Sequence, residues 1–112
     1  MRFKLTLLKT KKDFEAFRRS KSYQTSFIRI RVIKQANQNN PRFGFIVPKK
    51  VFAKATTRNL IKRRIKSFLV KFGPEIKPVD VLIFPAANLI KKKYSELETE
   101  INNLFSTANL WK

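Results

Sequence analysis

The stretch RNLIKRRIKSFLVKF, from Arg58 to Phe72, decides how this 112-residue chain folds. On a helical wheel of about 100° per residue, its apolar side chains gather within roughly 100° of arc. These side chains are Ile61, Ile65, Phe68, Leu69 and Phe72. A stripe of this width predicts a helix with one face against a core. We expect the helix to begin at Thr56 or Thr57 and to run to about Lys71. It should end at Gly73-Pro74, because glycine accepts a left-handed cap and proline cannot continue a helix.

The same helix has a cationic face. The arc beside the apolar stripe holds Arg58, Asn59, Lys62, Arg63 and Lys66, and Arg64 flanks the stripe on its other side. No carboxylate occurs in this stretch, although like charges at i,i+4 cost a few tenths of a kcal/mol per pair. The pattern indicates a surface for phosphates, which arginine binds in a bidentate manner and lysine binds as a point charge. A merely solvated basic face is the alternative.

Strands are expected on both sides of this helix. The segments 42–47 (RFGFIV) and 79–84 (VDVLIF) are apolar, and a strand–helix–strand unit makes its two strands parallel. An earlier strand, 26–34, alternates in character, which predicts that Ile28, Ile30 and Val32 face the core while Phe27, Arg29 and Arg31 face the other way. The polar segment 35–41 (QANQNNP) is expected to turn between this strand and the strand at 42–47, so that the two form a hairpin.

Two further helices are predicted, one near each end of the chain. The first covers Lys11 to Arg19, with Thr10 as its cap, Asp13 at the positive end of its dipole and Phe14 and Phe17 on one face. The last begins at Ser95, with Glu98 completing a capping box. Its apolar stripe consists of Leu97, Ile101, Leu104, Phe105 and Ala108. The prediction is a single α+β domain over residues 1–112, an α/β sandwich with a mixed four-stranded-type sheet in the order α-β-β-(β)-α-β-α.

The composition narrows the possible functions. Lys and Arg total 26 against 7 Asp and Glu, a net charge of +19, which favours nucleic acid over other partners. The absence of Cys and His excludes disulfides and the commonest metal sites and general bases. No apolar run approaches the roughly 20 residues that span a bilayer, and no signal peptide is apparent, so we expect a cytoplasmic protein without a membrane partner. The carboxylates are dispersed along the chain, so we expect no catalytic residue, no metal ligand and no cofactor held by the protein.

Aromatic and basic side chains recur together near the N-terminus. Phe14 and Phe17 share a helix face, and Phe27, Arg29 and Arg31 share a strand face. Aromatic rings stack on unpaired bases with little sequence preference, while cations follow the backbone, so such a surface suits single-stranded RNA. The alternative for Phe14 and Phe17 is that both rings belong to the core.

In these features the chain resembles the protein component of bacterial ribonuclease P. The resemblance lies in Val47-Pro48-Lys49-Lys50-Val51 at a strand end, followed by a helix starting Arg58-Asn59 with a run of basic residues. Lys12-Asp13-Phe14 and Val79-Asp80-Val81 also follow the family pattern. The departures are Pro48 in place of Ser, Phe52 in place of Gly, and Leu60 in place of the second Arg of Arg-Asn-Arg. A further one is Arg18 in place of an aromatic four residues after the first.

The resemblance implies both a fold and a function. The expected fold contains a left-handed crossover around the basic helix, although about 98% of such connections are right-handed. The implied function is that of a subunit of an endoribonuclease without catalytic residues of its own. It would help a catalytic RNA remove the 5′ leader of precursor tRNA and lower the requirement for magnesium, with the magnesium held by the RNA. The expected partners are the RNA subunit and precursor tRNA, with neither DNA nor membrane.

Two sets of site residues follow from the resemblance. The set for the RNA subunit is Lys49, Lys50, Arg58, Asn59, Lys62, Arg63, Arg64 and Lys66. The set for the 5′ leader is Phe14, Phe17, Arg18, Phe27, Arg29 and Arg31. From the residues alone, a structural RNA-binding protein such as a ribosomal protein remains open, as does a binder of polyanions or membrane surfaces.

Overall fold

A computed structural model describes residues 4–8, 11–34 and 38–112. The strands are β1 (Thr6–Leu7), β2 (Lys21–Gln24), β3 (Ile28–Ile33), β4 (Arg42–Phe45) and β5 (Asp80–Pro85). The helices are α1 (Lys11–Glu15), α2 (Ala55–Phe72) and α3 (Tyr94–Thr107), with short 3₁₀ helices at Ala16–Arg19, Gly73–Glu75 and Ala87–Lys91. The first predicted helix is therefore a turn of α-helix that tightens into a 3₁₀ helix. The Thr10 cap and the first part of the predicted turn, 35–37, lie outside the described residues.

All five strands form one mixed sheet in the order β1-β4-β5-β3-β2. The predicted hairpin between β3 and β4 is wrong, because β5 lies between them, parallel to β4 and antiparallel to β3. Five of the six residues of β5 are buried, so the central position removes the most apolar strand from water. The parallel pairing across α2 is confirmed, whereas the hand of this crossover stays a prediction. β1 and β2, which the sequence patterns did not predict, occupy the two edges.

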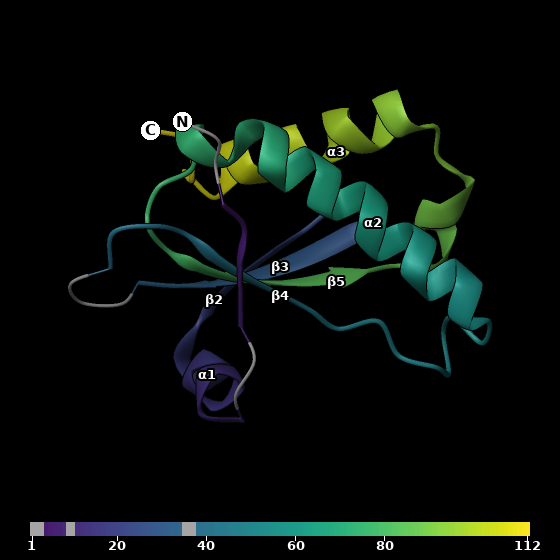
Figure 1. Cartoon of the computed structure of the whole chain (residues 1–112), viewed down its shortest axis with the longest axis horizontal. Helices are drawn as coiled ribbons and strands as arrows, with labels where there is room; N and C mark the ends of the chain where they lie inside the picture. Colours follow the sequence, from purple (N-terminus) through teal and green to yellow (C-terminus); the bar gives the residue numbers. More distant parts are fainter. Residues whose placement is uncertain (1–3, 9–10, 35–37) are drawn as a thin grey trace.

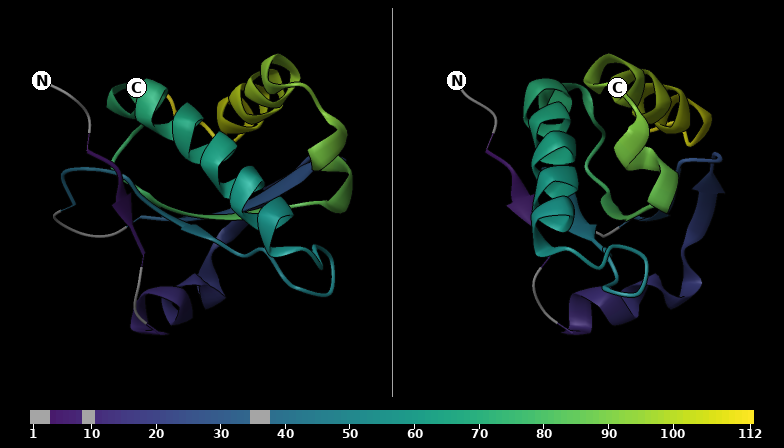
Figure 2. Two further views of the ribbon diagram at one scale, coloured as in Figure 1. Left: turned by 45° about the vertical axis from the view of Figure 1, so that its right-hand side comes forward. Right: turned by 90° about the vertical axis from the view of Figure 1, so that its right-hand side faces the viewer.

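The helices divide between the two faces of the sheet. α2 and α3 lie side by side on one face, and α1 lies on the other (Figures 1 and 2). The main core forms between the sheet and the helix pair, where the predicted stripes of α2 and α3 are buried as expected, with only Phe72 and Ala108 partly buried. A smaller cluster of Leu8, Phe17 and Leu82 lies under α1. The predicted α+β fold is confirmed, with five strands where a four-stranded type of sheet was predicted and with two long helices on one face (Figure 1).

Two predicted helix ends are wrong in detail. Gly73 has φ −51° and ψ −43°, so its conformation is right-handed; it is buried, and it begins the 3₁₀ helix Gly73–Glu75, with Pro74 in the first turn. At the start of α3, the Lys93 amide donates to the Glu96 carboxylate at 2.9 Å, so Glu96 takes the capping position predicted for Glu98. Glu98 instead pairs with Lys71 at 3.5 Å, which links α3 to the end of α2.

Candidate nucleic-acid interface

The cationic face of α2 is on the outside of the molecule. Asn59 and Arg63 are exposed, and Arg58, Lys62, Arg64 and Lys66 are half-buried. Among the described residues, none of these cations pairs with a carboxylate, because Glu98 of α3 pairs with Lys71 at the far end of α2. An Arg and Lys surface without carboxylate neighbours keeps its full potential for phosphates. The structure therefore brings this set together on one element, and Leu60 is half-buried beside it.

Arg58 differs from the rest of the set because the protein itself uses its guanidinium. One Nη donates to the carbonyl oxygens of Phe52 at 2.7 Å and Ala53 at 3.1 Å. These bonds tie the start of α2 to the loop before it, and that loop carries Lys49 and Lys50, which are both exposed. Removing Arg58 would thus release the loop as well as a charge. A clean test of phosphate binding requires Lys62 and Arg63 instead.

The loop before α2 is held by a buried anchor. The amides of Val51 and Phe52 both donate to the Pro48 carbonyl, at 3.1 and 2.9 Å, and the Phe52 ring is 3% exposed within the main core. A turn closed at Pro48 and anchored at Phe52 presents the lysines between them to solvent. Of the two departures from the family pattern in this loop, Phe52 therefore has a structural role, since its ring fills the core. The carbonyl that closes the turn at Pro48 would be present with any residue at that position.

A second candidate surface lies on the face of the sheet that α1 covers only in part. Arg29 is exposed on this face, and its guanidinium carbon lies 4.4 Å from the centre of the Phe84 ring. The sequence patterns did not predict Phe84 as a site residue, although the alternation of side chains along β5 could have identified it. Val81 and Ile83 belong to the main core, whereas Leu82 and Phe84 pack under α1 on the other face. Bases stack on aromatic rings and on arginine guanidinium planes, so this stacked pair can receive an unpaired base.

Arg31 lies on the same face as Arg29, two residues along β3. Its side chain is half-buried, and its Nε is buried without a hydrogen-bond partner among the described residues. A guanidinium with an unused donor can still bind a phosphate or a base edge. Arg18 is exposed on the 3₁₀ turn after α1. Binding of the leader by these arginines stays a prediction.

Two aromatic residues of that set lie elsewhere. Phe17 is 2% exposed and forms the smaller core cluster, so its ring cannot stack on a base without opening that cluster, and its place in the leader set was wrong. Phe27 precedes β3, so strand alternation does not orient it. It packs against the main core with the Lys92 ammonium 4.0 Å from its ring centre, and not with Arg29 and Arg31.

Phe14 is the aromatic side chain of α1 that stays partly exposed. It packs against the smaller cluster directly above Gly44 of β4. A Cβ on Gly44 would lie 3.2 Å from the Phe14 ring and 2.9 Å from Leu82, so the absence of a side chain lets α1 approach the sheet closely. The close approach holds the Phe14 ring beside the Arg29 face.

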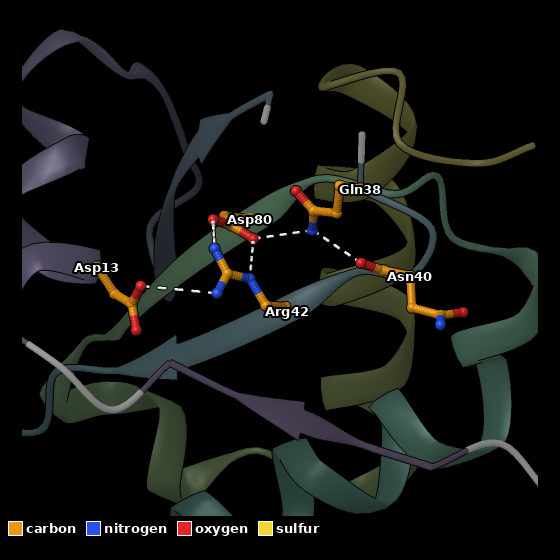
Figure 3. A network of polar contacts seen from close by, with 5 residues as sticks. All are labelled: Asp13, Gln38, Asn40, Arg42 and Asp80. Atoms are coloured by element: carbon orange, nitrogen blue, oxygen red, sulfur yellow. Dashed lines mark hydrogen bonds and ion pairs between the residues drawn. The ribbon is translucent and has the colours of Figure 1, made fainter. Parts of the chain in front are cut away.

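A polar network joins α1 to the same sheet (Figure 3). Arg42 donates from Nε and Nη2 to the two oxygens of Asp80, at 2.9 and 2.6 Å, and lies 3.6 Å from Asp13 of α1. Gln38 adds a bond to Asp80 at 2.8 Å and one to the Asn40 carbonyl at 2.7 Å. The hydrogen bonding of Arg42 to the Asp80 carboxylate is the main cause of the raised pKa of Arg42. Asp80, which stood alone in the sequence, thus connects β4, β5 and the segment before β4.

The described residues contain no group of three or more His, Cys, Asp or Glu side chains that could hold a metal ion. The buried carboxylate, Asp80, is bonded to Arg42 and so is not free to act as a ligand. In the described part of the chain, no helix is both long and apolar enough to cross a bilayer.

Comparison with known proteins agrees with this arrangement. The model of the family described as Ribonuclease P matches residues 4–109. The chain belongs to the ribonuclease P protein family. The ribonuclease P protein component of Synechocystis sp. is 35% identical over 105 residues, covering 92% of this chain and 85% of the relative. That of Rippkaea orientalis is 30% identical over 113 residues, covering 96% and 89%.

Solved structures of this family share the fold. The ribonuclease P protein of Staphylococcus aureus superposes with a TM-score of 0.88 at 18% identity, covering 97% of this chain and all of the other. That of Thermotoga maritima gives a TM-score of 0.77 at 24% identity, covering 87% and 92%. Membership of the family gives the chain a role in ribonuclease P, a ribonucleoprotein endoribonuclease of tRNA processing, and implies an RNA subunit as its partner.

Proposed function

We propose that this chain binds the ribonuclease P RNA through α2 and the Lys49-Lys50 loop, and binds the 5′ leader of precursor tRNA through the opposite face of the sheet. The observation that carries the proposal is the pair of cationic surfaces on the two sides of one sheet. The surface of α2 is made up mainly of cations, which fits a structured phosphate backbone. The second surface combines Arg29, Phe84 and Phe14, which fits an unpaired strand.

The chemistry belongs to the RNA subunit in this proposal, with magnesium bound there. The protein contributes positive charge where two polyanions, the RNA subunit and the substrate, approach each other. Screening their repulsion lowers the concentration of magnesium needed for productive binding. The dispersal of carboxylates in the sequence, and the use of Asp80 to hold Arg42, support a role without catalytic residues. A cytoplasmic location belongs to the same proposal.

The test is cleavage of precursor tRNA by the cognate RNA subunit at low magnesium, with and without the protein. We expect strong stimulation by the protein with the cut at the mature 5′ end. Comparing cleavage of two substrates, one with a long leader and one with a leader of one nucleotide, distinguishes the contributions of the two surfaces. Loss of the Arg29 face should affect only the long leader, whereas loss of the α2 face should affect both. Equal cleavage with and without folded protein would refute the proposal and return the chain to the wider class of structural RNA-binding proteins.

The α2 assignment is tested with Lys62→Ala/Arg63→Ala. We expect weaker assembly with the RNA subunit and a smaller dependence of affinity on salt. The matched control is Lys4→Ala/Lys91→Ala, which removes the same charge from two exposed positions outside both surfaces. Equal loss of affinity in the two variants would show that net charge, and not the α2 face, governs assembly.

A further inference from the structure

A third surface remains after the two proposed RNA contacts are assigned. A cavity of about 430 Å³ opens between the β2–β3 hairpin and the segment that follows α3. Its size lies within the roughly 300–1,000 Å³ typical of pockets for small ligands. A second hollow, between α2 and α3, is about 210 Å³ and includes the carboxylate of Glu98, so it suits an anion poorly.

The cavity lies on the other side of the sheet from the proposed leader surface. Directly paired residues of neighbouring strands share one side of a sheet. Tyr23 pairs with the buried Ile30, so it faces the helix side, whereas Gln24 pairs with Arg29 on the leader side. Lys21 pairs with Val32, which packs against the main core, so Lys21 lies on the same side of the sheet as Tyr23. A ligand in the cavity therefore does not share residues with the Arg29–Phe84 surface.

The walls of the cavity combine an apolar floor with a cationic rim. Tyr23, Val32 and Leu110 line the floor, and all three belong to the main core or pack against it. Three lysines, Lys21, Lys34 and Lys77, line the same cavity. None of them pairs with a carboxylate within the described residues, and no Asp or Glu is among the lining residues. A phosphate alone would leave the floor in contact with water, and an apolar ligand would leave the ammonium groups unmatched.

The floor is also held in place by the backbone. The Lys77 amide donates to the Leu110 carbonyl at 2.8 Å, and Ile76 forms a β-bridge with Trp111. Asn109, directly before Leu110, adopts a left-handed conformation with φ 57° where the chain turns after α3, and it is one of the residues that line the cavity. Asparagine tolerates this conformation better than most residues. A site that is formed before the ligand arrives loses less entropy on binding.

We propose that this cavity binds a nucleoside 5′-phosphate unit, with the base against Tyr23 and the apolar floor and the phosphate between the lysines. The asparagine amide then lies where it can bond to a base edge. The unit is either a free mononucleotide or one nucleotide of an RNA strand that passes the β2 edge. The two sources present the same chemistry to the cavity.

The test is a titration of the full-length ¹⁵N-labelled protein with adenosine 5′-monophosphate, followed by ¹H–¹⁵N spectra at moderate ionic strength. We expect saturable shifts centred on the amides of Tyr23, Val32 and Leu110. Adenosine and inorganic phosphate should each bind at least about tenfold more weakly than the nucleotide, since each carries only part of the recognised chemistry. Shifts that centre on α2, or inorganic phosphate that reproduces those of the nucleotide, would overturn the proposal.

Variants assign the two halves of the site. Lys21→Ala/Lys34→Ala should weaken nucleotide binding about 5–10-fold, because two exposed ion pairs are lost. Lys4→Ala/Lys91→Ala, with the same net charge, should leave it unchanged, and equal weakening in the two variants would refute the site. Tyr23→Leu keeps an apolar floor and removes the ring, so it should weaken the nucleotide while sparing phosphate. A single-stranded RNA hexamer distinguishes the two sources of the nucleotide. If the hexamer competes with adenosine 5′-monophosphate at the same amides, the cavity accepts a nucleotide of an RNA strand. If the hexamer does not bind there, the cavity accepts only a free nucleotide.

Discussion

The network around Asp80 gives the sharpest prediction, because removal of one carboxylate breaks three hydrogen bonds at a buried position. Asp80 is 1% exposed and accepts two bonds from Arg42 and one from Gln38. In Asp80→Ala, the Arg42 guanidinium loses its main partner while it remains in a polar gap between β4 and α1. The substitution should therefore lower the free energy of unfolding substantially.

The size of the loss follows from the geometry. Breaking a buried ion pair from one side typically costs about 3–5 kcal/mol. Here the Arg42 side chain is 32% exposed and Asp13 lies 3.6 Å away, so water and a second carboxylate compensate in part. We therefore expect a loss of about 2–3 kcal/mol. With a urea m-value of roughly 1–1.5 kcal/mol/M for a small domain, the unfolding midpoint should fall by about 2 M.

The assay is urea unfolding followed by far-UV circular dichroism, at constant ionic strength because the net charge is +19. Asp13→Ala is the matched control, since it removes a carboxylate from the same guanidinium at longer range and should cost under about 1 kcal/mol. Asp80→Asn, which keeps the size and some hydrogen bonding, should fall between the two. A midpoint for Asp80→Ala within about 0.3 M of the parent would refute the reasoning, because it would mean that water replaces the carboxylate at little cost.

Three further outcomes are expected. Lys62→Ala/Arg63→Ala should reduce the slope of log affinity for the RNA subunit against log salt by about 1.4–1.8, if each cation contacts one phosphate; an unchanged slope would remove both residues from the interface. Phe84→Leu should weaken binding of a long-leader substrate about 2–5-fold while sparing one with a single-nucleotide leader, because Arg29 loses the ring beneath it; equal effects on the two substrates would argue against the assignment. Phe52→Gly, which introduces the residue common in the family, should cost about 3–5 kcal/mol of unfolding free energy in this core, and a midpoint close to the parent in urea would show that the loop is not anchored there.

The sequence alone determined the parts of the molecule that depend on local periodicity. The apolar stripe of α2, the core-facing row of β3 and the cationic face beside the stripe all follow from residue spacing, and the structure places them as predicted. The same holds for the parallel pairing of β4 and β5, since any strand–helix–strand unit of this length brings its strands together in one direction. The family resemblance rested on these same residues.

The tertiary structure decided what depends on neighbours distant in the chain. The insertion of β5 between β3 and β4 reflects competition among strands for the most buried position, which no local pattern records. Phe14 and Phe17 were predicted on one helix, but Phe14 lies in α1 and Phe17 in the 3₁₀ helix that follows it. Only Phe17 is fully buried, where it packs with Leu8 and Leu82. Asp80 found its partner Arg42 across two paired strands, 38 residues apart in sequence. Pairing and burial are properties of the assembled sheet, and for that reason only the fold could assign them.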